Sequence, residues 1–486
     1  MSIHPLLPAS WLLVLIAACS GCSDEGPTGP PDTGSPLIEV RFPSSATAFD
    51  RDSNGLVDLE VAFSDSLSGI DVSSIEVLSS RPLKGPAGSG SSLFEVWRVV
   101  RADTTGFVLE ETVDNLLPRG RTVLTVAVED RAGNRVSRTL TLDLPPAARH
   151  KVIDLRASLL LTTNVLATPD GRRVYVTTEE NDATAISVID AGRLKWVKTE
   201  RTTIRGGSHM ALDPARNRLY AMSIDHPFLF VFDLASETFL APIETNARGI
   251  GIAVSHTRGK AYIGLEVETQ ESGLISVVDL DQGVEERVIQ LGIGSAGNPG
   301  DRMGMNALVF DPDESRLYAS TSPSAVQGIL VVDPDEGRLL DQIELSPEND
   351  EILGGAIDMI RDGDLLVATS QNSLAPQGRL AVVPLADPQA IRFGLTGGQD
   401  IPINVAVSPD RRDYAFTAAT SSTDHAIKLM DTSTLEAIWE DRPAPPADRR
   451  IGIAFRPDGH VFFAAGSTRD PAPTGAPNEL TVYLYR

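Results

Sequence analysis

Between Leu37 and Leu144, apolar and polar residues alternate with a period of two over short runs, which Gly, Asp, Asn and Ser residues separate. Successive side chains of a β-strand point to opposite faces, so this alternation is typical of strands with one buried face. The runs are Leu37–Phe42, Leu56–Phe63, Ile75–Leu78, Phe94–Val100, Gly106–Glu110, Thr122–Glu129 and Val136–Leu142. Because no helical period separates these short runs, the pattern predicts a β-sandwich over residues 37–146.

The end of this region carries its most specific motif. The run Thr122–Glu129 leads into Asp130-Arg131-Ala132-Gly133-Asn134. Since Gly and Asn tolerate the positive φ of tight turns, we expect a hairpin here in which both residues supply it. The motif resembles the closing hairpin of bacterial Ig-like domains, which implies an Ig-like sandwich. The chain has no Cys…Trp…Cys spacing, so an antibody-type domain is excluded.

From residue 150 to the last residue, the sequence repeats itself at intervals of 42–56 residues. Each unit has an apolar segment that runs into a turn, a second strand, and a third strand that usually ends in Asp. Equivalent positions are Tyr175, Tyr220, Tyr262, Tyr318, Leu366, Tyr414 and Phe462, which are 45, 42, 56, 48, 48 and 48 residues apart. Seven four-stranded units of this size predict a seven-bladed β-propeller, so the expected fold class is all-β.

The repeat also resembles a known family. Its consensus is Ser-Pro-Asp-Gly, then Val-Tyr-Val, then Val-Ser-Val-Ile-Asp; the unit over residues 165–190 follows it with Thr168 in place of the Ser and Ile186 in place of the first Val of the last segment. This consensus is similar to the YVTN family over residues 151–486. That family includes YncE-like periplasmic proteins and shares its propeller shape with the lactonases. WD40 propellers are excluded, because neither a Gly-His nor a Trp-Asp pair recurs.

The repeat count also predicts how the ring closes. Every unit begins with its inner strand, and the seventh unit ends after its third strand. The segment 150–156 precedes the first inner strand and has an apolar strand pattern. Pairing of 150–156 with 480–485 would complete the last blade and remove two open sheet edges.

The first 36 residues predict export and membrane attachment. The apolar run Trp11–Ala18 is shorter than the roughly 20 residues of a membrane-spanning helix and fits a signal peptide. Ile16-Ala17-Ala18-Cys19 resembles the bacterial lipobox, although no Lys or Arg precedes the run. The resemblance implies lipidation of Cys19, with Cys22 as the alternative. An ordinary secretory signal with incidental cysteines is the other interpretation.

The same resemblance implies a location. Residues 1–22 would be the signal and lipobox, and residues 23–36, rich in Gly and Pro, a flexible tether. A Ser follows either cysteine, which resembles the pattern exported to the outer membrane. We therefore expect an exported protein that is lipid-anchored to the cell envelope, and this anchor is its only expected contact with the membrane.

Composition narrows the possible partners. Of 486 residues, 42 are Lys or Arg and 66 are Asp or Glu, giving a net charge of −24. This charge repels phosphate backbones, so nucleic-acid binding is not expected. Cys19 and Cys22 are the only cysteines, which excludes disulfides and thiol chemistry from the predicted domains.

Candidate chemistry lies on the predicted inner strands. Five residues before the turn anchors Pro169, Pro214, His256, Pro312, Ile360, Pro409 and Pro457, the chain has Asn164, His209, Gly251, Ala307, Gly355, Asn404 and Gly452. Polar residues nearby complete a candidate channel-mouth binding set of Asn164, His209, Arg248, Asn306, Asn404 and Arg450. The alternative is that these groups bind channel water or backbone.

A second candidate site lies in the predicted sandwich. Asp50, Asp52, Asn54 and Asp58 take positions 1, 3, 5 and 9 of a calcium-loop pattern, with Gly55 at position 6. The bidentate Glu of position 12 is missing. The loop is therefore either a Ca²⁺ site or an Asx-rich turn that leads into a strand.

No catalytic motif emerges from the sequence. It has no H-E-x-x-H, no G-x-S-x-G and no phosphate-binding glycine loop, and we expect no cofactor other than a possible Ca²⁺. The first hypothesis is a monomeric envelope protein whose non-catalytic propeller binds an unknown envelope protein or glycan. The others are a lactonase-like hydrolase or lyase that uses the channel, and a calcium-dependent surface adhesion protein.

Overall fold

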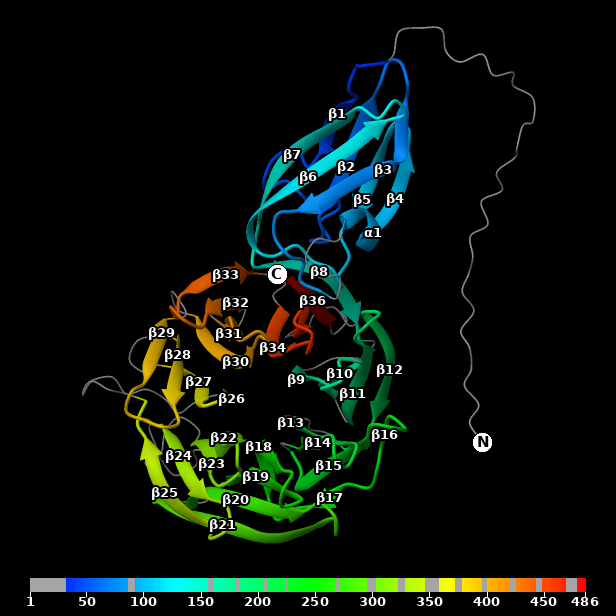
Figure 1. Ribbon diagram of the computed structural model, residues 1–486. Helices are drawn as coiled ribbons and strands as arrows, with labels where there is room; N and C mark the ends of the chain where they lie inside the picture. Colours follow the sequence, from blue (N-terminus) through cyan, green and yellow to red (C-terminus); the bar gives the residue numbers. More distant parts are fainter. Residues whose placement is uncertain are drawn as a thin grey trace, which may run out of the picture.

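The computed structural model divides the molecule into an N-terminal part with two sheets and a ring of further sheets (Figure 1). Cys19, Cys22 and most of the expected tether lie outside the described residues. The structure describes residues 32–85, 92–155, 161–180, 183–204, 209–223, 225–267, 271–294, 303–321, 328–345, 358–371, 378–395, 400–419, 425–442, 448–468 and 479–486. Within these ranges, no helix has the length and apolar character needed to cross a membrane.

The N-terminal part has a four-stranded and a three-stranded antiparallel sheet around one core, with strand orders β1-β2-β5-β4 and β3-β6-β7. Val61, Phe107, Leu124 and Leu142 are fully buried in this core. The elements are β1 (Leu37–Phe42), β2 (Asp58–Ser64), β3 (Ile70–Ser79), α1 (Leu93–Val96), β4 (Arg98–Asp103), β5 (Gly106–Glu110), β6 (Gly120–Asp130) and β7 (Arg135–Leu144).

Two expectations for this part are corrected. The run Phe94–Val100 is not one strand, because Ser92 caps the short helix α1 through a hydrogen bond from the Phe94 amide to its Oγ at 3.3 Å. In the β6–β7 hairpin, only Gly133 has positive φ, at 87°. Asn134 instead donates its backbone N–H and its side-chain amide to the Asp130 carboxylate, at 2.8 Å each.

The ring consists of seven antiparallel sheets, numbered sheet 1 to sheet 7 in chain order, of which sheets 3 and 4 are joined through β19 and β22. Sheet 1 contains β9 (Leu161–Ala167), β10 (Arg173–Glu180), β11 (Ala183–Asp190) and β12 (Lys195–Arg201), and sheet 2 contains β13 (Met210–Asp213), β14 (Arg218–Met222), β15 (Phe228–Asp233), β16 (Thr238–Phe239) and β17 (Ile243–Glu244). Sheet 3 contains β18 (Arg248–Ser255), β19 (Lys260–Val267), β20 (Glu271–Asp279) and β21 (Val284–Gly294), and sheet 4 contains β22 (Met303–Phe310), β23 (Leu317–Thr321), β24 (Ile329–Asp333) and β25 (Arg338–Ile343).

Sheets 5 to 7 complete the ring. Sheet 5 contains β26 (Asp358–Asp362), β27 (Leu365–Gln371), β28 (Gly378–Pro384) and β29 (Arg392–Leu395), and sheet 6 contains β30 (Ile401–Val407), β31 (Asp413–Ala419), β32 (His425–Asp431) and β33 (Ala437–Asp441). Sheet 7 contains β34 (Asp448–Phe455), β35 (Val461–Thr468), β36 (Glu479–Tyr485) and β8 (Ala147–Asp154). The first strand of each sheet lies nearest the centre of the ring (Figure 1).

The repeated aromatic positions pack between neighbouring sheets. Tyr175 of sheet 1 meets Phe232 of sheet 2 edge to face, with ring centroids 5.8 Å apart. Tyr262 of sheet 3 meets Phe310 of sheet 4 in the same way, at 5.2 Å. Edge-to-face contacts of buried rings add to the stability that burial of apolar surface provides. The repeated aromatic residues are therefore explained by packing between neighbouring sheets.

The last sheet combines strands from opposite ends of the ring. β8 pairs antiparallel with β36, from Glu479 opposite Asp154 to Tyr485 opposite Ala147. Ile153 and Leu480 are buried in the shared core of sheets 7 and 1. The segment ahead of the first inner strand therefore completes sheet 7.

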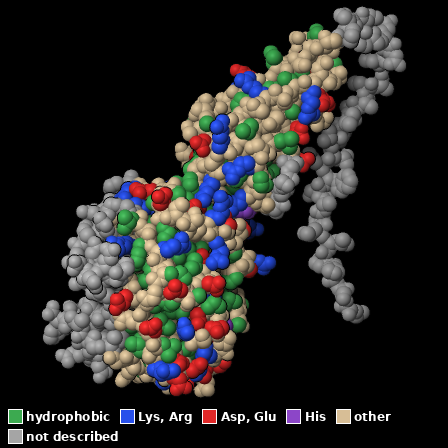
Figure 2. Space-filling model, turned by 60° about the vertical axis from the view of Figure 1, so that its left-hand side comes forward, with side chains coloured by type: hydrophobic (Ala, Val, Ile, Leu, Met, Phe, Trp, Pro, Cys, Tyr) green, Lys and Arg blue, Asp and Glu red, His purple; other side chains and the backbone are tan. Residues whose placement is uncertain are grey.

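The two parts of the molecule are joined by buried charged groups as well as by the chain. Both terminal nitrogens of Arg486 reach the Glu111 carboxylate, at 2.6 and 2.7 Å, and both side chains are fully buried. Arg119 pairs with Asp413, and the Lys84 ammonium lies 3.7 Å from the centre of the Tyr485 ring. Figure 2 shows Lys and Arg side chains gathered over this junction.

Candidate functional site

The inner strands bring a ring of equivalent positions to the central channel. On each inner strand, this position lies four residues before the residue that begins the turn to the second strand. The seven residues are Asn164, His209, Gly251, Ala307, Asp358, Asn404 and Gly452. The strand registers support this equivalence, since Asn164, Asp358 and Asn404 lie opposite Thr177, Thr369 and Thr417 of the neighbouring strands.

Five of these residues, all except Gly251 and Gly452, line a cavity of about 170 Å³ to which all seven sheets contribute residues. Its polar lining comes from Asn164, His209, Asp358 and Asn404, and apolar residues such as Met210 and Ile453 form the rest. Asn164, Asp358 and Asn404 are each only 7–8% exposed. A cavity in which a few polar groups converge among apolar residues has the lining of a ligand site, although its volume suits only a small molecule.

His209 has a defined orientation. Its Nδ1 lies 3.0 Å from the carbonyl oxygen of Ile250, in the neighbouring sheet. Because a carbonyl oxygen only accepts hydrogen bonds, Nδ1 carries the proton in this contact. In the neutral ring, Nε2 is then a hydrogen-bond acceptor.

Asp358 is the most perturbed group of the cavity. Burial raises the pKa of its carboxyl group, while the charge of His209 and the backbone N–H groups of Val405 and Met359 act in the opposite direction. Its Oδ2 accepts the Val405 amide at 2.9 Å, which links sheet 5 to sheet 6. A desolvated carboxyl group near a histidine is typical of binding and catalytic sites.

Two of the seven ring positions are glycines because a side chain would not fit there. A Cβ atom on Gly251 would lie 2.8 Å from the Asn306 carbonyl oxygen, and one on Gly452 would lie 2.8 Å from the Asn164 carbonyl carbon. Neighbouring inner strands approach too closely for side chains at these positions. The polar side chains are therefore confined to four of the seven sheets.

Counting from the turns chose the wrong residue in sheet 5. Gly355 lies outside the described residues, and Asp358 takes the equivalent position because β26 and β27 are joined by only two residues, Gly363 and Asp364. Ile360, the turn anchor that the sequence suggested, lies three residues before the residue at the equivalent turn position, so the predicted channel residue was three residues too early. The short turn was visible in the sequence, so recognising it could have revealed Asp358.

Two residues of the candidate binding set, Arg248 and Asn306, do not line the cavity, and the side chain of a third, Arg450, lies outside the described part of the chain. Asn306 lies within a break in register, between residues 305 and 308, and the backbones of Arg248 and Arg450 lie next to the breaks at 249–252 and 450–453. A bulge changes the face to which the following residues point, so simple alternation fails there. Arg248 lies opposite Glu266, and Arg450 opposite Gly466.

The predicted calcium loop gathers three of its four residues. Oxygens of Asp50, Asp52 and Asp58 lie within 4.8 Å of one another. Both Asp50 oxygens accept backbone N–H groups of the loop, from Asn54 at 3.1 Å and Gly55 at 2.6 Å. The Asn54 side chain accepts the Leu56 amide at 2.8 Å. The loop thus has the hydrogen bonds of an Asx-rich turn together with a cluster of carboxylates.

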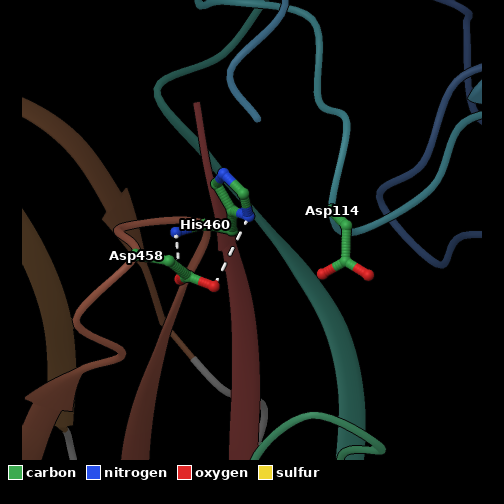
Figure 3. A group of neighbouring side chains, drawn as sticks. All are labelled: Asp114, Asp458 and His460. Atoms are coloured by element: carbon green, nitrogen blue, oxygen red, sulfur yellow. Dashed lines mark hydrogen bonds and ion pairs between the residues drawn. The ribbon is translucent and has the colours of Figure 1, made fainter. Parts of the chain in front are cut away.

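A further cluster lies between the two parts of the molecule. Figure 3 shows Asp458 and His460 on a turn of sheet 7, and Asp114 facing them from the N-terminal part. The buried Arg456 guanidinium contacts Asp114 at 3.3 Å and Asp458 at 2.7 Å. Since an arginine already provides the positive charge at this position, the cluster is an ion-pair network that joins the two parts.

Comparisons with known proteins support the fold alone. No family model matches the sequence, and no curated protein matches it. Among solved structures, 1332 chains match, including hydrazine synthase of Kuenenia stuttgartiensis. That match has 15% identity and a TM-score of 0.50, and it covers 64% of this chain and 94% of the other. Together with the sheets of the ring, it supports a propeller-type all-β fold.

Proposed function

We propose that this chain is an exported envelope protein with a lipid anchor, an Ig-like spacer and a seven-bladed YVTN-like propeller that binds a small hydroxyl-rich ligand in its channel. The ligand class that fits is a monosaccharide unit of an envelope glycan. The supporting observation is the channel cavity, in which His209 and Asp358 offer hydrogen-bond acceptors and two asparagine amides offer donors and acceptors.

Direct binding tests this proposal. Isothermal titration with a panel of free monosaccharides should give saturable binding to the wild-type chain. Asp358→Ala should weaken binding of the same sugar at least tenfold, because the sugar hydroxyl groups lose their main hydrogen-bond acceptor. Asp387→Ala, which changes an exposed carboxylate of the same sheet, should bind like wild type. Absence of binding across the panel would contradict the proposal.

The pair of His209 and Asp358 also favours a second candidate function, a lactonase-like hydrolase. In the neutral ring with the proton on Nδ1, Nε2 of His209 can act as a general base on water. If so, δ-gluconolactone should be hydrolysed faster than in buffer, and His209→Gln should abolish the excess rate. A pH-stat assay decides between this function and simple binding, for which the rate equals that of buffer.

The anchor has its own test. The proposed lipidation predicts that the chain takes up radioactive palmitate in a Gram-negative host, that Cys19→Ala abolishes uptake, and that Cys22→Ala preserves it. Loss of uptake only in Cys22→Ala would move the anchor to Cys22. Uptake that neither variant affects would refute lipidation at both cysteines.

The carboxylates of Asp50, Asp52 and Asp58 favour calcium binding by the N-terminal part, as a calcium-dependent adhesion protein would need. Millimolar Ca²⁺ should then raise the melting temperature of the wild-type chain and leave that of Asp52→Ala unchanged. Asp143→Ala, which removes an exposed carboxylate from β7, serves as the control. An equal response of wild type and Asp52→Ala would contradict a calcium site here.

A further inference from the structure

The polar side chains of the channel cavity lack side-chain partners within the described protein. Asn164, Asp358 and Asn404 line the cavity and are each more than nine-tenths buried. In the described part of the chain, no group hydrogen-bonds to the side-chain amide of Asn164 or Asn404. The Asp358 carboxylate accepts backbone N–H groups alone, among them that of Val405 at 2.9 Å. Because buried polar groups are normally paired, groups left unpaired at a cavity point to a ligand.

The charge of this cavity is also unbalanced. Among its described lining residues, Asp358 is the only carboxylate, and none is a Lys or an Arg. His209 donates the proton on its Nδ1 to the Ile250 carbonyl oxygen, so Nε2 of the neutral ring accepts hydrogen bonds. A buried carboxylate is normally paired with a cation or bound to a metal ion. The cavity therefore favours a ligand that carries positive charge and donates hydrogen bonds.

The rest of the lining favours an organic cation over a metal ion. Ten of the fourteen lining residues are apolar, Met210, Ile252 and Ile453 among them. Protein sites for Ca²⁺ or Zn²⁺ surround the ion with several charged or imidazole ligands, whereas this lining offers one carboxylate and one imidazole. A carbon skeleton would cover the apolar walls, which a metal ion would leave bare. A primary ammonium group on a small carbon skeleton meets both requirements.

The polar residues form two pairs that face each other across the channel. Asn164 and His209 belong to the adjacent sheets 1 and 2, and Asp358 and Asn404 belong to the adjacent sheets 5 and 6 (Figure 1). The equivalent positions in sheets 3, 4 and 7 are Gly or Ala. A ligand that satisfies both pairs has an ammonium group at one end and hydroxyl groups at the other.

We infer that the channel ligand carries a protonated primary amine, which makes the monosaccharide an amino sugar. This inference rests on the proposed function, because it names the class of monosaccharide that the channel takes. The ammonium group donates hydrogen bonds to the Asp358 carboxylate and to the side-chain oxygen of Asn404. At the other end, a sugar hydroxyl group donates to Nε2 of His209 and accepts from the Asn164 amide. The buried carboxylate then has a cation beside it.

Isothermal titration at pH 7 tests this inference with two matched pairs of ligands. Glucosamine differs from glucose by an amino group in place of one hydroxyl group, and butylammonium and 1-butanol make the same comparison without a sugar. The wild-type chain should bind the charged member of each pair about tenfold more tightly, because only that member makes a charge-assisted hydrogen bond to Asp358.

Two variants show whether this preference depends on the channel carboxylate. Asp358→Asn keeps the shape of the side chain and an acceptor for the Val405 amide but removes the charge, so both affinity ratios should fall to about one. Asp387→Asn, at an exposed carboxylate of the same sheet, should leave both ratios as in the wild type. Each ratio compares two ligands on one variant, so a change in stability does not imitate the effect.

The outcomes separate this inference from the proposed function. If the wild-type chain binds glucose and glucosamine equally, the inference is overturned and the proposed function stands. If butylammonium binds in an Asp358-dependent way and no sugar binds, the ammonium site is supported and the monosaccharide function is contradicted. Failure of both charged ligands to bind overturns the inference. Asp358-dependent binding of Mn²⁺ alone, with displacement of butylammonium, overturns it in favour of a metal site.

Discussion

Asp358 places a carboxyl group in a buried position, which costs stability. It is 8% exposed and ties sheet 5 to sheet 6 through the Val405 amide. An asparagine of the same shape occupies the equivalent position in sheets 1 and 6 and would make the same backbone contact without a charge. The presence of a carboxyl group therefore favours a role in the channel over a purely structural one.

The pH dependence of stability follows from the raised pKa of Asp358. The folded chain holds this proton more tightly than the unfolded chain, so stability is lost as the pH rises from the ordinary carboxyl pKa of 3.8 through the raised pKa. Asp358→Asn removes this loss. We expect its melting temperature to exceed that of wild type at pH 7, and the difference to shrink toward pH 4.

Scanning fluorimetry between pH 4 and pH 8 measures this difference. Asp143→Asn, at an exposed carboxyl group of β7, should change the melting temperature little at any of these pH values. A variant Asp358→Asn that is less stable than wild type at pH 7 would show that the charged form of Asp358 stabilises the channel.

Among the elements, β8 closes the ring, because its pairing with β36 joins the two ends of the structure. Its neighbouring residues face opposite ways: Ile153 is 5% exposed and Val152 is 43% exposed. They therefore provide a matched test of closure.

Ile153→Asp places a carboxylate among the buried side chains of sheets 7 and 1, and we expect it to destabilise the chain by at least about 3 kcal/mol. Val152→Asp adds the same charge on the solvent side of β8 and should cost less than about 1 kcal/mol. Urea denaturation measures both. Similar losses in the two variants would contradict burial of one face of β8 in the closure.

Many of the strands could be predicted from the sequence, because the alternation of apolar and polar residues and the repeat spacing depend on which residues are buried locally. The predicted runs Leu37–Phe42 and Gly106–Glu110 coincide with β1 and β5. The failures occur where local rules break. A serine cap forms α1 in the run Phe94–Val100, and bulges move Arg248 and Asn306 away from the channel. Neither the cap nor the bulges change the hydrophobic period of the sequence.

At the scale of the whole molecule, the N-terminal part and the ring are held together by contacts that no sequence pattern announces. Glu111 and Arg486 are 375 positions apart, yet they form a fully buried bidentate pair. Glu111 also accepts the Val57 and Leu117 amides, at 3.0 and 2.5 Å. Such pairs depend on how two folded parts meet, which local periodicity does not encode.

Removing one partner of this pair should uncouple the two parts. Arg486→Met leaves the Glu111 carboxylate buried without its cation, a change that costs about 3–5 kcal/mol. We expect urea unfolding of the variant to show two separate transitions where the wild-type chain shows one. Arg338→Met, at an exposed site, should unfold like wild type. A single transition in Arg486→Met would mean that other contacts suffice for coupling.

The direct passage from β7 to β8 gives the molecule a mechanical property. Only Pro145 and Pro146 separate the last strand of the N-terminal part from the strand that completes sheet 7. A pull on the N-terminal part therefore enters the ring at its closing joint and not at a peripheral loop. The Arg486–Glu111 pair lies beside this entry point and shares the load, so the force that opens the ring should fall when the pair is removed.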